Sequence, residues 1–161
     1  MDSILIRRVD NADERSEIAA EVLLDLPEWF GLPESTKNYI DAARNQVLFV
    51  AELGRSPIGF ITLQQTGEHV CEIHCMGVKK AWHRKGVGLK LFKEFEKYAQ
   101  NYYDFMQVKT VDEGHYSEYD QTIAFYKRIG FQKMEVFPEL WDKANPCLIM
   151  IKTITRIEPV R

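Results

Sequence analysis

The sequence predicts an α/β fold in which helices flank a mixed, mostly antiparallel central sheet. Apolar runs of strand length alternate with segments whose apolar residues recur at helical spacing. Three consecutive strand-like runs are joined by short turns, which favours antiparallel hairpins. A later pair of strands is connected through a helix, which implies a parallel crossover. The expected element order is β-α-α-β-β-β-α-β-α-β-β.

The first half of the chain supplies a strand, two helices and three further strands. Asp10, Asn11 and Asp13 offer caps for the first helix, and Pro27 ends it. The expected bounds are a strand over 4–9, an aromatic connector over 28–33, a helix over 34–44 and strands over 47–53, 58–65 and 70–78. Turn-forming residues at 54–57 and 66–68 separate these three strands.

The second half begins with an amphipathic helix that follows Gly88. A strand over 105–111 comes next. Ser117 and Asp120 have the spacing of a capping box for the last helix, and Gly130 stands where a left-handed residue ends it. Strands over 131–136 and 148–154 complete the fold, and residues 137–142 are expected in the connection between them.

Length and composition narrow the function. The 161 residues fit one domain, 1–161, and the net charge of −3 disfavours a nucleic-acid partner. The sequence shows no apolar run of about 18 residues for a membrane span and no secretory signal at Met1-Asp2-Ser3. Three cysteines are too few for a disulfide framework, so a cytoplasmic location is expected. Cys71 and Cys75 lie roughly 13 Å apart on an extended strand, so we expect no metal.

A turn rich in glycine and basic residues follows the strand over 70–78 and opens a helix. The N-terminus of a helix has unpaired N–H groups and the positive end of the dipole, and glycine lets a bulky anion approach the backbone. The turn can therefore hold a pyrophosphate. Positive charge comes from Lys79, Lys80, Arg84 and Lys85. The alternative is a glycine-containing turn with solvated lysines. The motif is neither a Walker loop nor a full dinucleotide-binding fingerprint.

Two motifs resemble those of the GNAT superfamily of N-acetyltransferases. Residues 72–78 read Glu-Ile-His-Cys-Met-Gly-Val, and residues 83–88 read His-Arg-Lys-Gly-Val-Gly, which together resemble its motif A. Residues 122–131 read Thr-Ile-Ala-Phe-Tyr-Lys-Arg-Ile-Gly-Phe, which resembles motif B. The expected element order also matches the GNAT fold. The resemblance therefore covers nearly the whole chain.

The resemblance implies that acetyl-coenzyme A is the co-substrate. It places the pyrophosphate against the turn formed by His83, Arg84, Lys85, Gly86, Val87, Gly88 and Leu89. It assigns the pantetheine arm and the acetyl carbonyl to the backbone of Met76 and Val78, whose side chains are otherwise ordinary core residues. Gly77 fits a local irregularity of that strand.

Two side chains are implied in catalysis. Tyr126 is the expected general acid for the departing thiolate, since a tyrosine with a pKa of about 10 is protonated at neutral pH. Its alternative role is that of a core tyrosine. Glu72 is the candidate base that accepts the amine proton. Its alternative role is that of a solvent-facing strand residue. His74 is the second candidate, and a chain of waters is the third.

The expected acceptor is the primary amine of a small molecule or amino-acid derivative, which attacks directly in a ternary complex. Aromatic and carboxylate-rich segments suit a cationic amine. The candidate substrate-binding residues are Trp29, Phe30, His74, Tyr116 and Trp141. Alternatives are acetylation of a protein lysine or N-terminus, and a non-catalytic acyl-coenzyme A sensor. The family resemblance also makes a homodimer possible.

Overall fold

The computed structural model describes residues 3–157, so Met1, Asp2 and 158–161 of the predicted domain lie outside the described residues. The chain divides into two compact units. The first comprises Met1–Gln64 and His74–Tyr98, and the second comprises Gln65–Ile73 and Ala99–Arg161. Within the described residues, no helix is long and apolar enough to span a membrane.

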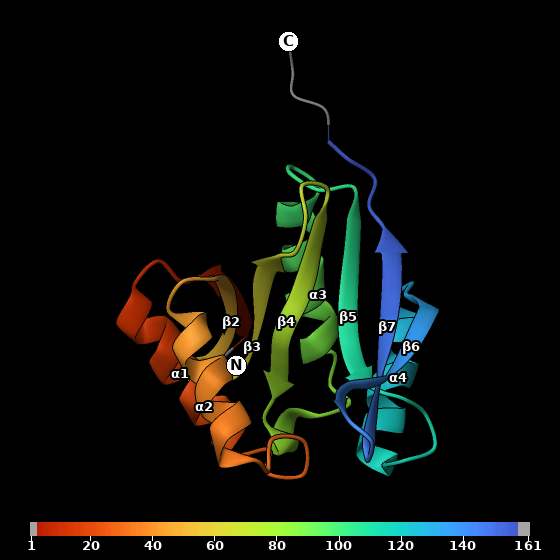
Figure 1. Cartoon of the computed structure of the whole chain (residues 1–161). Coiled ribbons are helices and arrows are strands. Elements are labelled where there is room, and N and C mark those ends of the chain that lie inside the picture. The colour runs from red at the N-terminus through yellow and green to blue at the C-terminus, as the bar shows by residue number, and fades with distance from the viewer. Residues whose placement is uncertain (1–2, 158–161) are drawn as a thin grey trace. The chain divides into compact units, whose positions relative to one another are not determined.

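The element order confirms the predicted one and forms a seven-stranded mixed sheet (Figure 1). Strands hydrogen-bond in the order β1-β2-β3-β4-β5-β7-β6. The β1–β2, β2–β3, β5–β7 and β6–β7 pairs are antiparallel, and β4–β5 is the predicted parallel pair. The elements are β1 Ile4–Arg8, α1 Ala12–Leu24, α2 Pro33–Ala43, β2 Val47–Leu53, β3 Ser56–Gln65, β4 Val70–Val78, a short 3-10 helix Lys80–Trp82, α3 Val87–Ala99, β5 Phe105–Val111, α4 Ser117–Arg128, β6 Gln132–Asp142 and β7 Asn145–Thr153.

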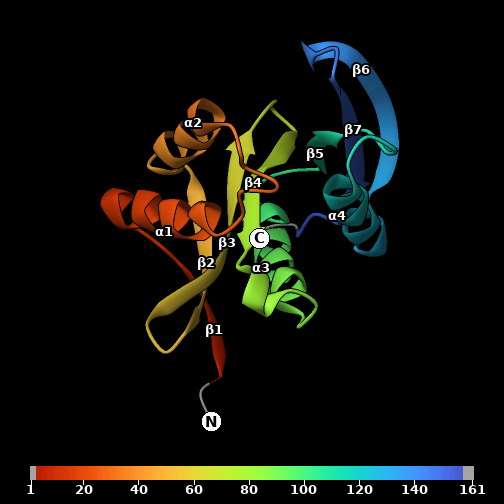
Figure 2. The same ribbon diagram turned by 90° about the horizontal axis from the view of Figure 1, so that it is seen from below.

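In the first unit, helices cover both faces of the strands. Successive strand residues point to opposite faces. Val50 of β2 belongs to the buried cluster that α1 also lines, whereas the Phe49 ring meets Tyr98 of α3 at a centroid distance of 6.2 Å. Helices α1 and α2 therefore lie on one face and α3 on the other, as seen along the strands in Figure 2.

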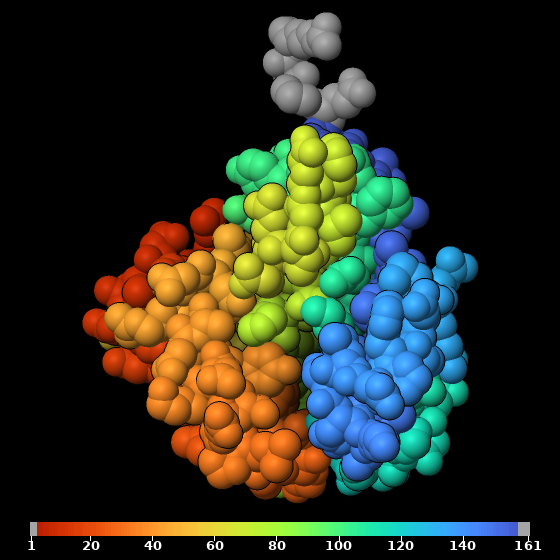
Figure 3. Space-filling view, in the orientation of Figure 1, coloured from red at the N-terminus to blue at the C-terminus, as the bar shows by residue number. Residues whose placement is uncertain are grey.

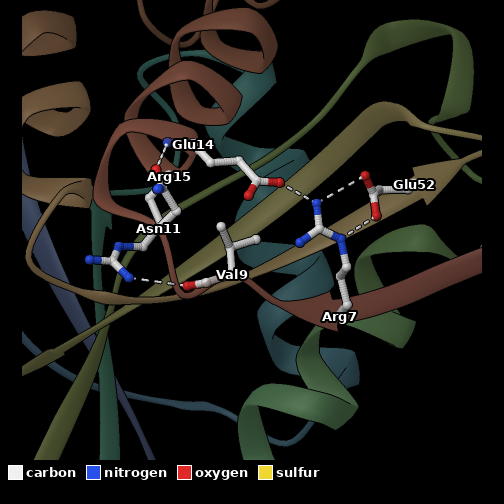
Figure 4. Close-up of polar contacts among 6 residues, drawn as sticks. All are labelled: Arg7, Val9, Asn11, Glu14, Arg15 and Glu52. Carbon is white, nitrogen blue, oxygen red and sulfur yellow. Dashed lines mark hydrogen bonds and ion pairs between the residues drawn. The ribbon is translucent and has the colours of Figure 1, made fainter.

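Helix α1 is held by caps and by arginines (Figure 4). The Asn11 side chain accepts the Glu14 N–H at 2.9 Å, so Asn11 is the cap among the three predicted candidates. Arg7 of β1 binds both carboxylate oxygens of Glu52 on β2, at 2.5 and 3.3 Å, and also binds Glu14. Arg15 donates to the carbonyl of Val9 at 3.1 Å. These contacts tie the start of α1 to the first two strands.

Gly77 of β4 is buried against α1. A Cβ atom there would lie 3.0 Å from Leu26 Cδ1 and 3.1 Å from Val22 Cγ1. Glycine is thus needed at this position for the close approach of the helix. This is a different reason from the strand irregularity expected from the sequence.

In the second unit, β5, β7 and β6 pair antiparallel in that order, and α4 precedes β6 (Figure 1). The predicted capping box is wrong. Tyr116 is the N-cap and makes no side-chain cap bond, while Asp120 accepts the Gly114 N–H at 3.0 Å. Gly130 has a φ of 107°, which confirms the left-handed end of α4.

Strand β6 is longer than the sequence predicted. It runs to Asp142, so the residues expected in a connection continue the strand, and β7 begins earlier, at Asn145. Two register shifts against β7 interrupt its pairing. Such bulges weaken the periodicity by which a strand is recognised. Most β6 side chains are exposed, and Figure 3 shows them, in light blue, at the surface.

Candidate active site

The predicted phosphate turn lies in the first unit, where β4 leads through the short helix Lys80–Trp82 into α3. Gly86 has a φ of 81°, and Arg84 is the one described non-glycine residue with a positive φ, at 60°. A Cβ atom on Gly86 would meet nothing within 4 Å, so the backbone there faces open space. Left-handed residues before a helix start turn backbone N–H groups toward an anion.

The charge on this turn differs from the prediction. Lys79 pairs with Glu21 at 2.6 Å, and Lys80 pairs with Glu28 at 2.9 Å. Glu28 holds the pKa of Lys80 above its usual value, and Lys80 in turn lowers the pKa of Glu28. The charges of both lysines are therefore compensated by carboxylates, one on α1 and one on the connector that follows it.

Arg84 and Lys85 remain as the basic side chains of the turn. The Lys85 ammonium lies 5.1 Å from the centroid of the Trp82 ring. Arg84 is exposed and makes no ion pair or hydrogen bond with the part of the chain that the structure describes. Arg84 is thus a side chain whose charge is available for a phosphate.

His83 has a local structural contact. Its Nε2 lies 2.5 Å from the carbonyl oxygen of Val78, and its ring meets the edge of Trp29 at 5.6 Å. A carbonyl only accepts, so the ring donates from Nε2. His83 therefore ties the turn to the end of β4. Met76 and Val78 are half-buried on that strand.

Three of the predicted substrate residues belong to this unit. Trp29 and Phe30 pack against the buried cluster under α1. The Phe30 ring contacts Tyr39 at 5.8 Å, and Tyr39 contacts the His74 ring at 5.2 Å. Phe30 and His74, 44 positions apart in sequence, are thus joined through Tyr39 of α2.

Glu72 lies in the second unit and is 5% exposed, so it is not the solvent-facing residue of the alternative interpretation. Its Oε1 accepts from Gln107 Nε2 at 2.9 Å and lies 3.3 Å from Lys109 Nζ. Both partners come from β5, which pairs with β4 at Glu72 itself. The cation compensates the buried charge, and Oε2 takes neither bond.

Tyr126 is 6% exposed on α4. Its ring packs edge-on against Phe125 and Phe131, at 5.6 and 5.5 Å. This aromatic packing fixes the ring. The other two predicted substrate residues of the unit are exposed: Tyr116, at the start of α4, contacts Tyr119, and Trp141 lies on β6. Burial raises the pKa of Tyr119.

The cysteines are buried free thiols. Burial raises the pKa of Cys71 to about 12 and that of Cys147 to about 11, with Glu72 adding to both shifts and Lys109 opposing the second. Burial also raises the pKa of Cys75. These thiols stay protonated at neutral pH, so they are poor nucleophiles. Residues 3–157 contain no group of three or more histidine, cysteine or acidic side chains placed to hold a metal.

The family is shown by comparison with known proteins. Residues 44–133 match the model of the acetyltransferase (GNAT) domain. N-alpha-acetyltransferase RimI of Mycobacterium tuberculosis is 23% identical over 127 residues, which cover 77% of this chain and 74% of RimI. This chain belongs to the GNAT family of acetyltransferases and is an N-acetyltransferase that uses acetyl-coenzyme A.

Solved structures show the same fold. A GNAT-family protein from Desulfovibrio desulfuricans has a TM-score of 0.80 and 15% identity, with 94% of this chain and 99% of that chain covered. An aminoglycoside 6'-N-acetyltransferase complexed with coenzyme A has a TM-score of 0.72 and 19% identity, with 97% and 99% covered. At these identities the likeness establishes the fold.

Several neighbours of the predicted site were not found from the sequence. Gln107 and Lys109 are polar residues two apart in β5, and that spacing is a signal that points them to one face. Tyr39 and Gln46 carry no such signal, because their positions depend on how α2 and β2 pack. They lie next to His74 in the structure.

Proposed function

We propose that the protein transfers the acetyl group of acetyl-coenzyme A to the primary amine of a small molecule or amino-acid derivative, by direct attack in a ternary complex. The observation that carries the proposal is the turn before α3, with left-handed Arg84 and Gly86 and open space at Gly86. A pyrophosphate needs this combination of free backbone N–H groups, positive dipole and close approach.

The turn binds the pyrophosphate of the co-substrate, and β4 binds its pantetheine arm and acetyl group. The N–H groups of Gly86, Val87, Gly88 and Leu89 bind the pyrophosphate oxygens, and Arg84 adds a charge-assisted bond. Lys85 and His83 shape the turn through Trp82 and Val78. The Val78 carbonyl already accepts from His83, so its N–H is the group assigned to the pantetheine arm or acetyl carbonyl, together with the backbone of Met76.

Proton movement is assigned to two buried side chains. A free alkylamine has a pKa of about 10.4 and must lose a proton before it attacks. Glu72 accepts this proton at Oε2, directly or through water, while Lys109 and Gln107 hold Oε1. Tyr126 donates its hydroxyl proton to the departing thiolate. Its rigid packing on Phe125 and Phe131 supports a fixed donor direction.

The acetyl acceptor is assigned to aromatic residues on the connector, α2 and β4. Phe30, Tyr39 and His74 form a continuous set of ring contacts, and Trp29 flanks the turn through His83. Aromatic faces attract an ammonium group, which supports a small cationic amine. Tyr116 and Trp141 are exposed and remain predicted contacts of the acceptor.

Acetylation of a protein N-terminus is the second candidate, because the curated relative is named as an N-alpha-acetyltransferase. Coenzyme A release measured against an amine panel and a peptide panel separates the two. The proposal expects turnover with amines, and turnover with peptides alone would show that the acceptor assignment is wrong.

Tyr126→Phe tests the assignment of Tyr126 as the general acid. We expect kcat to fall about 100-fold, within the usual range for loss of a general acid. Affinity for acetyl-coenzyme A should change little. Tyr103→Phe is the matched control, since that buried hydroxyl bonds Gln65 instead. An unchanged kcat in Tyr126→Phe would contradict its role as the general acid.

Gly86→Glu tests the phosphate turn. Gly54→Glu is its matched control, because Gly54 also has a positive φ, 63°, and open space around it, in the β2–β3 turn. Both variants carry the same backbone strain of about 1–2 kcal/mol. Calorimetry should show cofactor binding lost in Gly86→Glu alone. Normal binding by that variant would contradict the assignment of the turn.

Two further predictions belong to the same proposal. The edge strand β6 exposes Met134, Val136, Leu140 and Trp141, which suits pairing with a second copy. Sedimentation at several protein concentrations measures this homodimer. The cytoplasmic location stays a prediction that rests on the small number of cysteines.

A further inference from the structure

Gln46 precedes β2 and connects two other polar side chains of the first unit. It is 7% exposed. Its Nε2 donates to Gln64 Oε1 at 2.8 Å and lies 3.0 Å from His74 Nδ1. The amide nitrogen of glutamine has two hydrogens and does not accept. With one hydrogen directed to Gln64, the other is donated to His74.

This donation determines where His74 carries its proton. A ring nitrogen that accepts a hydrogen bond has no hydrogen of its own. Nδ1 is therefore unprotonated, and the neutral ring carries its hydrogen on Nε2. A proton cannot be added at Nδ1 without breaking the bond from Gln46.

The reverse orientation of the Gln46 amide is less favourable. It would place the NH₂ group where Oε1 now lies, and that position is buried without a hydrogen-bond partner among residues 3–157. A buried donor without a partner is rarer than an acceptor in the same situation. The observed orientation uses both hydrogens of the amide.

We propose that Gln46 is a positioning residue that holds His74 in its Nε2–H form, so that His74 donates a hydrogen bond to the acceptor molecule. This inference rests on the proposed acceptor site at Phe30, Tyr39 and His74. It implies that the amine substrate has, near its amino group, an oxygen that can accept this hydrogen bond, such as a hydroxyl or carbonyl oxygen. It also removes His74 from the candidate bases and leaves Glu72 or water.

The protonation state is measured without turnover, by ¹⁵N–¹H correlation spectra of the histidine rings in the full-length protein. We expect the His74 hydrogen on Nε2 at neutral pH. Gln46→Glu replaces the donor by an acceptor, so the ring should then carry a hydrogen on Nδ1. Gln46→Met is the control without either group and should lose the preference. A parent spectrum with the hydrogen on Nδ1 would overturn the inference.

The role in turnover is measured with two His74 variants, once the amine panel has supplied a substrate. Glutamine places an N–H near the position of Nε2, so His74→Gln should retain kcat/KM within about threefold. His74→Leu lacks a donor and should lose about tenfold, mainly through the KM of the amine. If both variants lose kcat equally, His74 is a base and the inference fails. If no amine is acetylated, the proposed function fails, and the spectra still decide the tautomer.

Discussion

Two buried carboxylates, Glu52 on β2 and Glu72 on β4, show how similar residues are used differently. They are 8% and 5% exposed. Arg7 binds both oxygens of Glu52 in a fork, and a second acid, Glu14, shares the same guanidinium (Figure 4). At Glu72 both donors bind Oε1. A carboxylate bound at both oxygens is a structural link, whereas one with an uncommitted oxygen retains capacity for a proton.

The largest expected effect separates these two acids by activity. Glu72→Gln should lower kcat about 100-fold, because the amide cannot take up the amine proton at neutral pH. Glu52→Gln is the matched variant and should leave kcat within about twofold. Steady-state assays with a substrate from the amine panel measure both. Equal losses of kcat in the two variants would show that Glu72 has no catalytic role that Glu52 lacks.

The next effect separates them by stability. Arg7→Met leaves the Glu52 charge buried, and we expect the free energy of unfolding to fall by about 2 kcal/mol. That is below the usual cost of breaking a fully buried pair, because the Arg7 side chain is 36% exposed. Urea denaturation measures it. Lys109→Met is the counterpart at Glu72 and should cost about 1 kcal/mol, since Gln107 still donates. A larger loss of stability in Lys109→Met than in Arg7→Met would indicate that Glu72, and not Glu52, is the structural link.

The smallest effect depends on pH. Burial raises the pKa of Cys147 to about 11, with Lys109 lowering it and Glu72 raising it. The thiol has a pKa of about 8.5 in the unfolded chain and a higher pKa in the folded protein. The free energy of unfolding is therefore constant below about pH 8.5 with respect to this group, and it falls as the pH rises from there toward the pKa of the folded thiol. From about pH 8 to about pH 9 the Cys147→Ala variant should lose less stability than the parent, by at most about 1 kcal/mol. Identical slopes would contradict the raised pKa.

The fold was largely predictable because its signals are local. The bounds of β2, β4 and β5 were predicted to the residue, since apolar runs between turns define buried strands. The end of β6 was not, because its exposed side chains and register shifts remove the usual pattern. Ser117 has the sequence of a capping residue, but the helix begins with it. Such a choice depends on tertiary packing.

The site was predictable in part for a related reason. The glycine turn before α3 follows from residue type and position, whereas the left-handed φ of Gly86 is a finding of the structure. Ion pairs between distant segments do not, so the neutralisation of Lys79 and Lys80 by acids of α1 and its connector was missed. The same holds for Gln46, whose bond to His74 spans 28 positions.

The contact between Lys85 and Trp82 has a practical consequence for optical measurements. Indole fluorescence is sensitive to a nearby charge, and the turn places a cation above one indole ring while His83 lies at the edge of a second, Trp29. An anion seated on the turn changes the field at both chromophores. The remaining tryptophan, Trp141, lies on β6 of the other unit. Replacing it by phenylalanine leaves an emission signal that comes from Trp82 and Trp29, which contact residues of the turn, without an attached dye.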